Sequence, residues 1–271
     1  MNLKTASAHE AIFNQCDMRD CSRQCIRKTD PLVEGFPLYI GGSGFVAHVA
    51  DRTCFFTARH VFADPDGQID EDKLRRVLVI KDWGDKRGRN LSFEDIYFPC
   101  IPASAGSVQI LNDVLMLSCH HKPENETEDG FLVFNDGHRA ADPAYCSSHP
   151  LWIYGFPNIA GNAPIDYDSK VYRPNRVEVK ARFEHFDERG HIGVARIIHA
   201  FSEDGEPFHM VAPPDGMSGS VVLEEDPVDG RMAWAGMLIS GGNNTVRFIT
   251  IRFLIEFAVK VVRDERAAGK W

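Results

Sequence analysis

Three residues of the types used in nucleophilic catalysis, His60, Asp113 and Ser218, stand at the ends of apolar stretches. His60 comes two residues after Ala58, the end of the mainly apolar stretch 54–58, and Asp113 directly precedes the apolar residues 114–117. Ser218 lies in the stretch Gly-Met-Ser-Gly, just before another apolar stretch. A serine that attacks a carbonyl needs a histidine to accept its proton and a carboxylate to orient that histidine. The three residue types therefore indicate acyl transfer if the fold brings them together.

Each of the three also has an ordinary structural explanation when it is taken alone. A histidine after a strand is usually structural, and an aspartate before a strand commonly caps a turn. The stretch around Ser218 is more specific, because glycines on both sides allow a tight turn. The backbone N–H groups of such a turn can point outward and stabilise a developing oxyanion. Together, the order of the three residues and the strands beside them favour catalysis.

The elements that must position these residues are short strands. Runs rich in aromatic and β-branched residues, separated by glycines and polar turns, predict strands and not an alternation of strands and helices. The predicted strands cover residues 36–40, 44–49, 53–57, 75–81, 96–99, 108–111, 114–118, 151–154, 177–183, 194–201, 220–223 and 232–239. Many short strands of this kind are typical of barrels and sandwiches.

Two helical segments are expected at the ends of the chain. Leu254, Phe257, Ala258 and Val261 recur at helical spacing, which predicts an amphipathic helix packed on a barrel. The first thirty or so residues are rich in charge and predict a short helical extension.

Composition indicates an ordinary globular protein. The 271 residues are 44% hydrophobic and 25% charged, and the formal net charge is −9, which disfavours nucleic acid as a partner. No apolar stretch approaches the length of a membrane span, and residues 1–19 contain no apolar run of signal-peptide type. We therefore expect a cytoplasmic protein with no membrane partner.

The chain has seven cysteines, and in the reducing cytosol free thiols are the expected state. Cys16, Cys21 and Cys25 lie close together, with His9 upstream. Their spacing lacks the C-x2-C pair of a zinc knuckle. A zinc site or a redox switch is one interpretation, and small apolar positions on a helix are the other.

Taken as a set, the catalytic segments resemble the trypsin/chymotrypsin-like serine peptidases, in particular bacterial members of intracellular type. The resemblance lies in Thr-Ala-Arg-His at residues 57–60, in Asp113 before an apolar strand, and in Gly-Met-Ser-Gly at residues 216–219. The order His, Asp, Ser is the one found in that family. The stretches Gly-Ser-Gly-Phe at 42–45 and Tyr-Gly-Phe-Pro at 154–157 are similar to segments of bacterial relatives. The resemblance covers roughly residues 34 to 262.

The resemblance implies an all-β fold of two six-stranded antiparallel β-barrels, with a C-terminal helix and a short N-terminal helical extension. It divides the chain into an extension at 1–33, a first barrel with the histidine and aspartate at 34–140, and a second barrel with the serine plus the helix at 141–271. No metal or organic cofactor is expected. Protein or peptide substrates are the expected partners, and the extension or a regulatory partner would control activity.

The activity implied is that of a serine endopeptidase with an acyl-enzyme intermediate. Ser218 would be the nucleophile, His60 the general base and Asp113 the residue that orients it. The N–H groups of Gly216 and Ser218 would form the oxyanion hole. Met217 replaces the aspartate that digestive members use in zymogen activation, so that route of activation is not expected.

The substrate-binding residues implied by the resemblance are Ala212 at the base of the P1 pocket and Ser240, Gly241 and Gly242 in its wall. No carboxylate stands at that base, which disfavours Arg or Lys at P1. A neutral or apolar P1 residue is expected, and His209 leaves room for an acidic one.

Two other functions use the same fold. One is a catalytically silent, protease-like binding module, and the other is an esterase-type acyl hydrolase. Ser220 and Ser240 are the other serines near Ser218, and we interpret both as structural, as we do His199.

Overall fold

A computed structural model describes most of the chain from residue 21 onward. The described residues are 21–28, 38–50, 52–63, 68–69, 74, 77–80, 93, 95–101, 108–119, 132–134, 142–157, 165–166, 171–172, 176–202, 205–208, 210, 213 and 215–271. The predicted helix within the first twenty residues, Cys16 and His9 lie outside the described residues.

The first half of the chain forms a sheet that is antiparallel except at one strand. Its order is β4-β1-β2-β3-β6-β5, and β7 pairs in parallel with the end of β2. The strands are β1 (Ser22–Lys28), β2 (Leu38–Val49), β3 (Arg52–Ala58), β4 (Val77–Ile80), β5 (Asp95–Tyr97), β6 (Val114–Cys119) and β7 (Leu132–Phe134). Two short helices, η2 (Arg59–Val61) and α3 (Val108–Leu111), lie in its connections.

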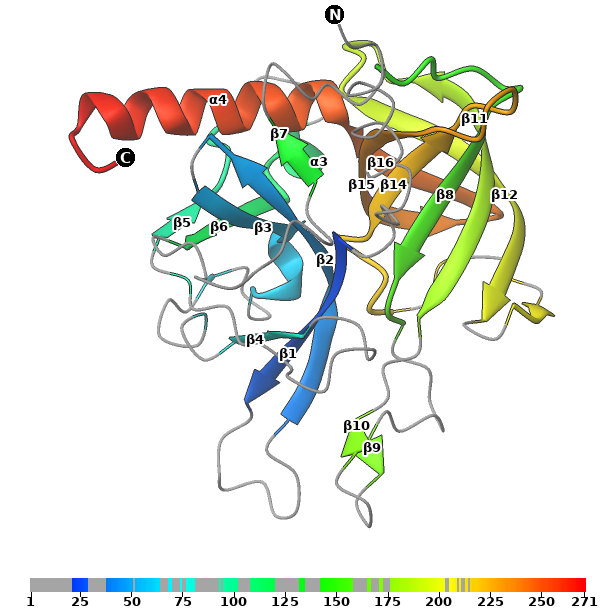
Figure 1. Cartoon of the computed structure of the whole chain (residues 1–271), viewed down its shortest axis with the longest axis horizontal. Coiled ribbons are helices and arrows are strands. Elements are labelled where there is room, and N and C mark those ends of the chain that lie inside the picture. Colours follow the sequence, from blue (N-terminus) through cyan, green and yellow to red (C-terminus); the bar gives the residue numbers. More distant parts are fainter. Residues whose placement is uncertain are drawn as a thin grey trace, which may run out of the picture.

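The second half forms a closed six-stranded antiparallel barrel. Its order is β11-β8-β14-β15-β16-β12, and pairing of β12 with β11 closes the ring (Figure 1). The strands are β8 (Pro150–Gly155), β11 (Val177–Phe186), β12 (Ile192–Ser202), β14 (Val221–Glu225), β15 (Met232–Gly242) and β16 (Thr245–Thr250). The short β13 (Pro207–Phe208) adds to β12, and β9 (Ile165–Asp166) pairs with β10 (Val171–Tyr172).

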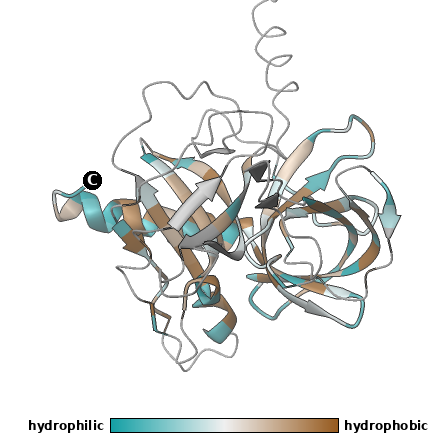
Figure 2. Cartoon of the chain, turned by 90° about the horizontal axis from the view of Figure 1, so that it is seen from below, coloured by the Kyte–Doolittle hydropathy of each residue, from teal (hydrophilic) through white to brown (hydrophobic). Residues whose placement is uncertain are grey.

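Alternation along the barrel strands divides the apolar residues between two cores. In β14, Val222 packs inside the barrel, whereas Val221 and Leu223 belong to a second cluster on its outer side. That second cluster also contains Phe45 and Phe56 of the first sheet, so one core joins the two halves. In Figure 2 apolar residues run along the strands of both halves.

The helix α4 (Ile251–Ala267) confirms the amphipathic helix predicted at the C-terminus. It begins directly after β16 and runs across the first sheet (Figure 1). Its buried residues include Leu254, Phe257, Ala258 and Val261, and they belong to the core that joins the halves. None of the helices in the described part of the chain has the length and apolar character needed to cross a membrane.

The structure differs from the sequence-based expectation in several elements. Residues 108–111 form the helix α3 and not a strand, and the strands β7, β9, β10, β13 and β16 were not predicted. Residues 22–28 form the strand β1 and not a helix, because pairing with β2 and β4 decides their backbone conformation. The first sheet therefore begins before residue 34, the boundary that the sequence suggested, and in the described residues it is not closed into a barrel.

The connection between the two halves is held by a buried carboxylate. Glu224 is 3% exposed and accepts hydrogen bonds from the backbone N–H groups of Ala144 and Tyr145, at 2.6 and 2.7 Å. Its Oε1 also lies 3.1 Å from Nδ1 of His149. The Tyr145 hydroxyl donates to the carbonyl of Ala235, and burial raises the pKa of this tyrosine well above its ordinary value. The linker is thereby attached to β14 and β15.

We predict that Glu224→Gln destabilises the chain. The amide presents one oxygen and one NH2 group where the carboxylate accepts from two N–H groups, so a buried donor loses its acceptor at a cost of about 1–3 kcal/mol. Urea denaturation should show this loss in the free energy of unfolding. The control is Glu256→Gln, because Glu256 is 53% exposed on α4 and should cost little. Equal stability of the two variants would contradict the assignment of Glu224.

Candidate active site

His60 and Asp113 are brought together by the pairing of β3 with β6. The register pairs Ala58 with Val114, so the residues just after β3 and just before β6 are neighbours. The backbone N–H of Arg59 donates to the Asp113 carbonyl at 2.6 Å. The helix η2 then turns the chain so that the His60 ring faces the aspartate. Two stretches far apart in the sequence thus meet at one end of the sheet.

The carboxylate of Asp113 uses both oxygens on His60. Oδ1 accepts the backbone N–H of His60 at 2.8 Å, and Oδ2 lies 2.6 Å from the ring nitrogen Nδ1. The Asp113 side chain is 18% exposed and the His60 side chain is 51% exposed. Contact of Nδ1 with the aspartate fixes the ring orientation and leaves Nε2 as the nitrogen that can act on a substrate. This is the arrangement of a general base with its orienting group.

The turn that carries Ser218 has the backbone that its glycines permit. Gly216 and Gly219 have φ values of 91° and 92°, in the left-handed region. The N–H of Gly219 donates to the Leu238 carbonyl at 2.8 Å, and the Leu238 N–H donates to the Ser220 carbonyl at 2.8 Å. The turn therefore leads into β14, and these hydrogen bonds hold it on β15.

The Ser218 hydroxyl is directed at the backbone of β15 and not at the histidine. Its Oγ donates to the carbonyl of Ile239 at 3.0 Å. In the described part of the chain, the hydrogen bonds of His60 go to Asp113. The structure thus joins His60 and Asp113 by hydrogen bonds. It holds Ser218 in a rotamer in which the hydroxyl contacts β15 and not His60.

Ser43 of β2 docks the Ser218 turn onto the first sheet. Its N–H donates to the Ser218 carbonyl at 3.2 Å, and its hydroxyl donates to the Gly216 carbonyl at 2.6 Å. The same hydroxyl accepts the N–H of Phe156 at 2.7 Å, and its carbonyl accepts the Thr57 hydroxyl at 2.7 Å. Because Thr57 lies three residues before His60, one buried serine connects the Ser218 turn to the strand that precedes His60.

The N–H groups of Gly216 and Ser218 were predicted to form an oxyanion hole. Among the described residues, no protein acceptor takes the N–H of Gly216 or of Ser218. Two neighbouring N–H groups without an internal acceptor, on a turn held in place by hydrogen bonds, can bind an oxygen on which negative charge develops.

The predicted specificity residues are only partly described. Ala212 and His209 lie outside the described residues. Ser240 is exposed, and the α-carbon of Gly241 packs so closely on Pro213 that a Cβ would lie 2.4 Å from its Cδ. Gly241, one of the predicted wall residues, therefore packs on the residue that follows Ala212 in the sequence.

The end of β15 has a strand partner on one side only, within the described chain. Residues 238–242 pair with β16, whereas the pairing of β14 with β15 ends at Met237. The other edge, from Ile239 to Gly242, lies beside the Ser218 turn. An extended peptide can pair with an edge of this kind through backbone hydrogen bonds.

The described part of the chain contains no cluster of three or more metal-ligating side chains. Cys21 and Cys25 are buried in the core, beside and on β1. No model of a known protein family matches the chain, and no curated protein sequence is similar to it. The functional interpretation therefore depends on the geometry of the site.

Three contributors to the site were missed from the sequence: Ser43, Thr57 and the carbonyl of Ile239. Gly-Ser-Gly-Phe at 42–45 and Thr57 were noticed as parts of motifs, but only the fold shows what their hydroxyls contact. Ser220 is structural as expected, because its buried hydroxyl donates to the Met217 carbonyl.

We predict that Gly219→Ala detaches the turn from the sheet. A Cβ at this position would lie 2.1 Å from the Ser43 carbonyl oxygen and 2.6 Å from the Thr57 hydroxyl. The control is Gly230→Ala, because Gly230 also has a positive φ, of 70°, but has nothing within 4 Å of its Cβ position. Both variants carry backbone strain of about 1–3 kcal/mol, and only Gly219→Ala adds a steric clash. Thermal unfolding should show a clearly larger loss for Gly219→Ala, and an equal loss would contradict the docking described above.

Proposed function

We propose that the chain is a serine endopeptidase that hydrolyses peptide bonds through Ser218, His60 and Asp113. The observation that carries the proposal is the two-point contact of Asp113 with His60, at 2.8 and 2.6 Å. A carboxylate that contacts both the backbone and the ring of one histidine fixes the ring in the orientation that a general base needs. Docking of the Ser218 turn on Ser43 supports the proposal, because it ties the turn to the strands that carry that base.

In the proposed mechanism, rotation about χ1 of Ser218 moves its hydroxyl from the Ile239 carbonyl to Nε2 of His60. The hydrogen bond given up contributes only about 1 kcal/mol net, so substrate binding can offset its loss. Ser218 Oγ attacks the scissile carbonyl while His60 takes its proton, and Asp113 stabilises the imidazolium. His60 then protonates the leaving amine, and water attacks the acyl-enzyme by the same route in reverse.

Two other parts of the site are assigned by this proposal. The N–H groups of Gly216 and Ser218 receive the oxyanion of the tetrahedral intermediate. The carbonyl of Ile239, released by the rotation of Ser218, becomes an acceptor for a backbone N–H of the substrate. The substrate then lies as a strand along Ile239 to Gly242.

The proposal extends to the fold of the first half. We take its strands as a second barrel, in which the edge strands β4 and β5 approach each other. Support comes from the six strands in the order β4-β1-β2-β3-β6-β5, the same number as in the closed barrel. The cleft between two such barrels is where His60, Asp113 and Ser218 would act.

A silent binding module is the alternative favoured by one specific observation. The Ser218 hydroxyl donates to the Ile239 carbonyl, so in the described conformation it is not hydrogen-bonded to His60. A nucleophile that stays in this rotamer would leave a cleft that binds and does not cut.

We predict that a fluorophosphonate probe labels Ser218 in the purified protein. Peptide mapping should find the adduct on Ser218 and not on Ser240, which is the exposed serine nearby. His60→Ala should abolish labelling, and Asp113→Asn should slow it by a factor of about 10⁴, because the histidine would hold the wrong tautomer.

Cleavage of a mixed peptide library by the same preparation then separates a peptidase from an esterase. Lack of labelling in protein that unfolds cooperatively would contradict the peptidase proposal and favour the binding module. Labelling with ester hydrolysis and no peptide cleavage would favour the esterase.

We predict that Ser43→Ala slows the reaction without unfolding the chain. Loss of its hydroxyl frees the Gly216 carbonyl and displaces the oxyanion donors, and a displacement of about 1 Å can cost about 100-fold in rate. The fall should appear in kcat and in the labelling rate, with KM little changed.

The matched control for this prediction is Ser22→Ala. Ser22 is also buried and donates from the first sheet to the barrel, at 2.9 Å to the Tyr154 carbonyl, but it does not touch the Ser218 turn. An equal loss of rate in both variants would mean that Ser43 acts through stability alone.

A further inference from the structure

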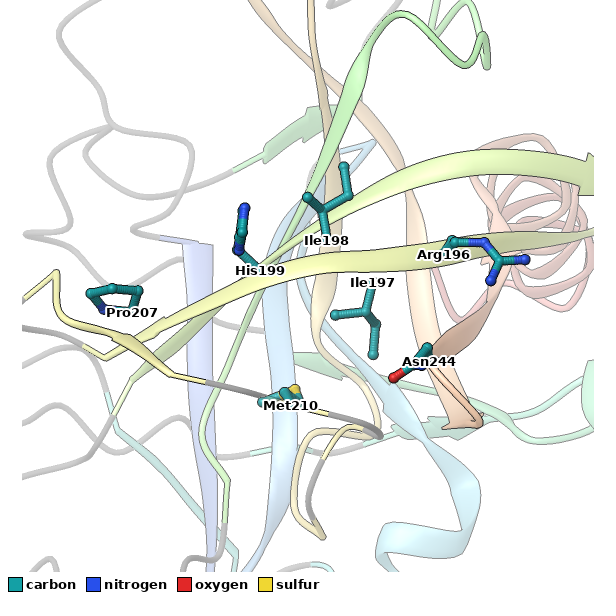
Figure 3. A pocket seen from close by; sticks show the side chains of 7 residues that line it. All are labelled: Arg196, Ile197, Ile198, His199, Pro207, Met210 and Asn244. Carbon is teal, nitrogen blue, oxygen red and sulfur yellow. The ribbon is translucent and has the colours of Figure 1, made fainter.

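A pocket of about 420 Å³ opens beside the end of the edge strand described above. It is lined by residues of β12, of β13, of the segment that leads to the Ser218 turn, and of the turn between β15 and β16: Arg196, Ile197, Ile198, His199, Pro207, Met210 and Asn244. Figure 3 shows Arg196 and Asn244 at one end, His199 and Pro207 at the other, and Ile197 and Met210 between them. The pocket thus has polar ends and an apolar middle.

The pocket lies beside the turn that follows β15. The backbone N–H of Ile197 donates to the Asn244 carbonyl at 2.8 Å, which ties β12 to the turn that follows β15. Asn244 lies two residues after Gly242, the last residue of the free edge. A peptide strand that pairs with that edge therefore ends close to the pocket. The pocket offers open space for a side chain beside this end of β15, because Asn244 is one of its lining residues.

Positive charge is concentrated on the outer face of the barrel at this end of the pocket. Arg196 of β12 stands directly opposite Arg182 of β11, and Arg247 lies on the adjacent strand β16. Like charges directly opposite each other on neighbouring strands destabilise a sheet. The arrangement occurs in a chain whose formal net charge is −9, so it is not a consequence of overall basicity.

One acidic group partly compensates this charge. Nε of Arg196 donates to Oε1 of Glu184 at 2.6 Å, and the Arg196 side chain is 52% exposed. Within the described residues, the Nη groups of Arg196 have no protein acceptor, and neither Arg182 nor Arg247 has an ion-pair partner. Planar guanidinium donors without acceptors bind a carboxylate with two parallel hydrogen bonds.

We infer that this pocket receives an acidic side chain of a bound peptide, held by Arg196 and by the side-chain amide of Asn244. The inference rests on the proposed function, because it takes the ligand to be the peptide substrate of the same cleft. Apolar neighbours of the acidic residue pack on Ile197 and Met210. The preferred substrates are thus peptides in which a glutamate or aspartate lies between apolar residues.

Binding can be measured apart from catalysis in the Ser218→Ala variant. The probes are two fluorescein-labelled peptides, Ala-Leu-Glu-Leu-Ala and Ala-Leu-Gln-Leu-Ala, which differ by one charge and have nearly the same shape. Fluorescence anisotropy should give tighter binding of the glutamate peptide. Adding Arg196→Gln should weaken that binding by about tenfold, the effect of losing one hydrogen-bonded charge pair, and should leave the glutamine peptide unchanged.

Two further variants complete the test. Asn244→Gly removes the amide and retains the backbone conformation, because Asn244 has a positive φ of 61°, and it should also reduce the preference for glutamate. Arg252→Gln is the matched control, since Arg252 is exposed and pairs with Glu256 through Nε, but on α4. Equal binding of the two peptides, or an equal effect of Arg196→Gln and Arg252→Gln, would overturn the inference.

The outcome is distinct from that of the peptidase proposal. A preference for glutamate without probe labelling of Ser218 would retain the pocket and reject the peptidase. Labelling of Ser218 without a preference for glutamate would retain the peptidase and reject this pocket as its acidic subsite.

Discussion

Docking of the Ser218 turn on Ser43 is the interaction on which the rest of the site depends. The turn belongs to the barrel, whereas the His60–Asp113 pair belongs to the first sheet, so a contact between the halves must align them. Ser43 does this with all of its polar groups, which contact Ser218, Gly216, Phe156 and Thr57. The absence of a side chain at Gly219 lets the two backbones approach. The shared apolar core and α4 behind this contact prevent the two halves from shifting.

The same alignment leaves one degree of freedom, the rotamer of Ser218. Its hydroxyl can donate to the Ile239 carbonyl or to His60, and the first of these is observed. A substrate that pairs with the edge of β15 needs that carbonyl, so substrate binding and activation of the nucleophile are coupled in the proposed mechanism. The coupling is small in energy because only one hydrogen bond is exchanged. Met217 is buried in the barrel core and carries no charge for zymogen-type activation. Activation coupled to substrate binding would suit an enzyme that lacks that route.

Much of the architecture could be predicted from the sequence, because strand and helix periodicity is local. The strand predicted at residues 177–183 and the helix predicted from the spacing of Leu254 to Val261 are both observed. Residues 108–111 were misassigned because a short, mostly apolar run fits a strand or a helical turn equally well. The contacts of Ser43, the rotamer of Ser218 and the pocket at Arg196 arise from pairing between distant strands, which no local pattern encodes. The proximity of His60 and Asp113 could be expected, because each residue stands in a motif at the end of a predicted strand.

The most direct test of the account is a crystal structure of the protein after reaction with a phosphonate inhibitor. We expect a covalent bond from Ser218 Oγ to phosphorus, with the phosphonyl oxygen within hydrogen-bonding distance of the Gly216 and Ser218 N–H groups. Nε2 of His60 should face the adduct while Asp113 keeps both of its contacts with the histidine. A structure in which Ser218 is unmodified and still donates to Ile239, or in which the adduct forms on another residue, would contradict the account.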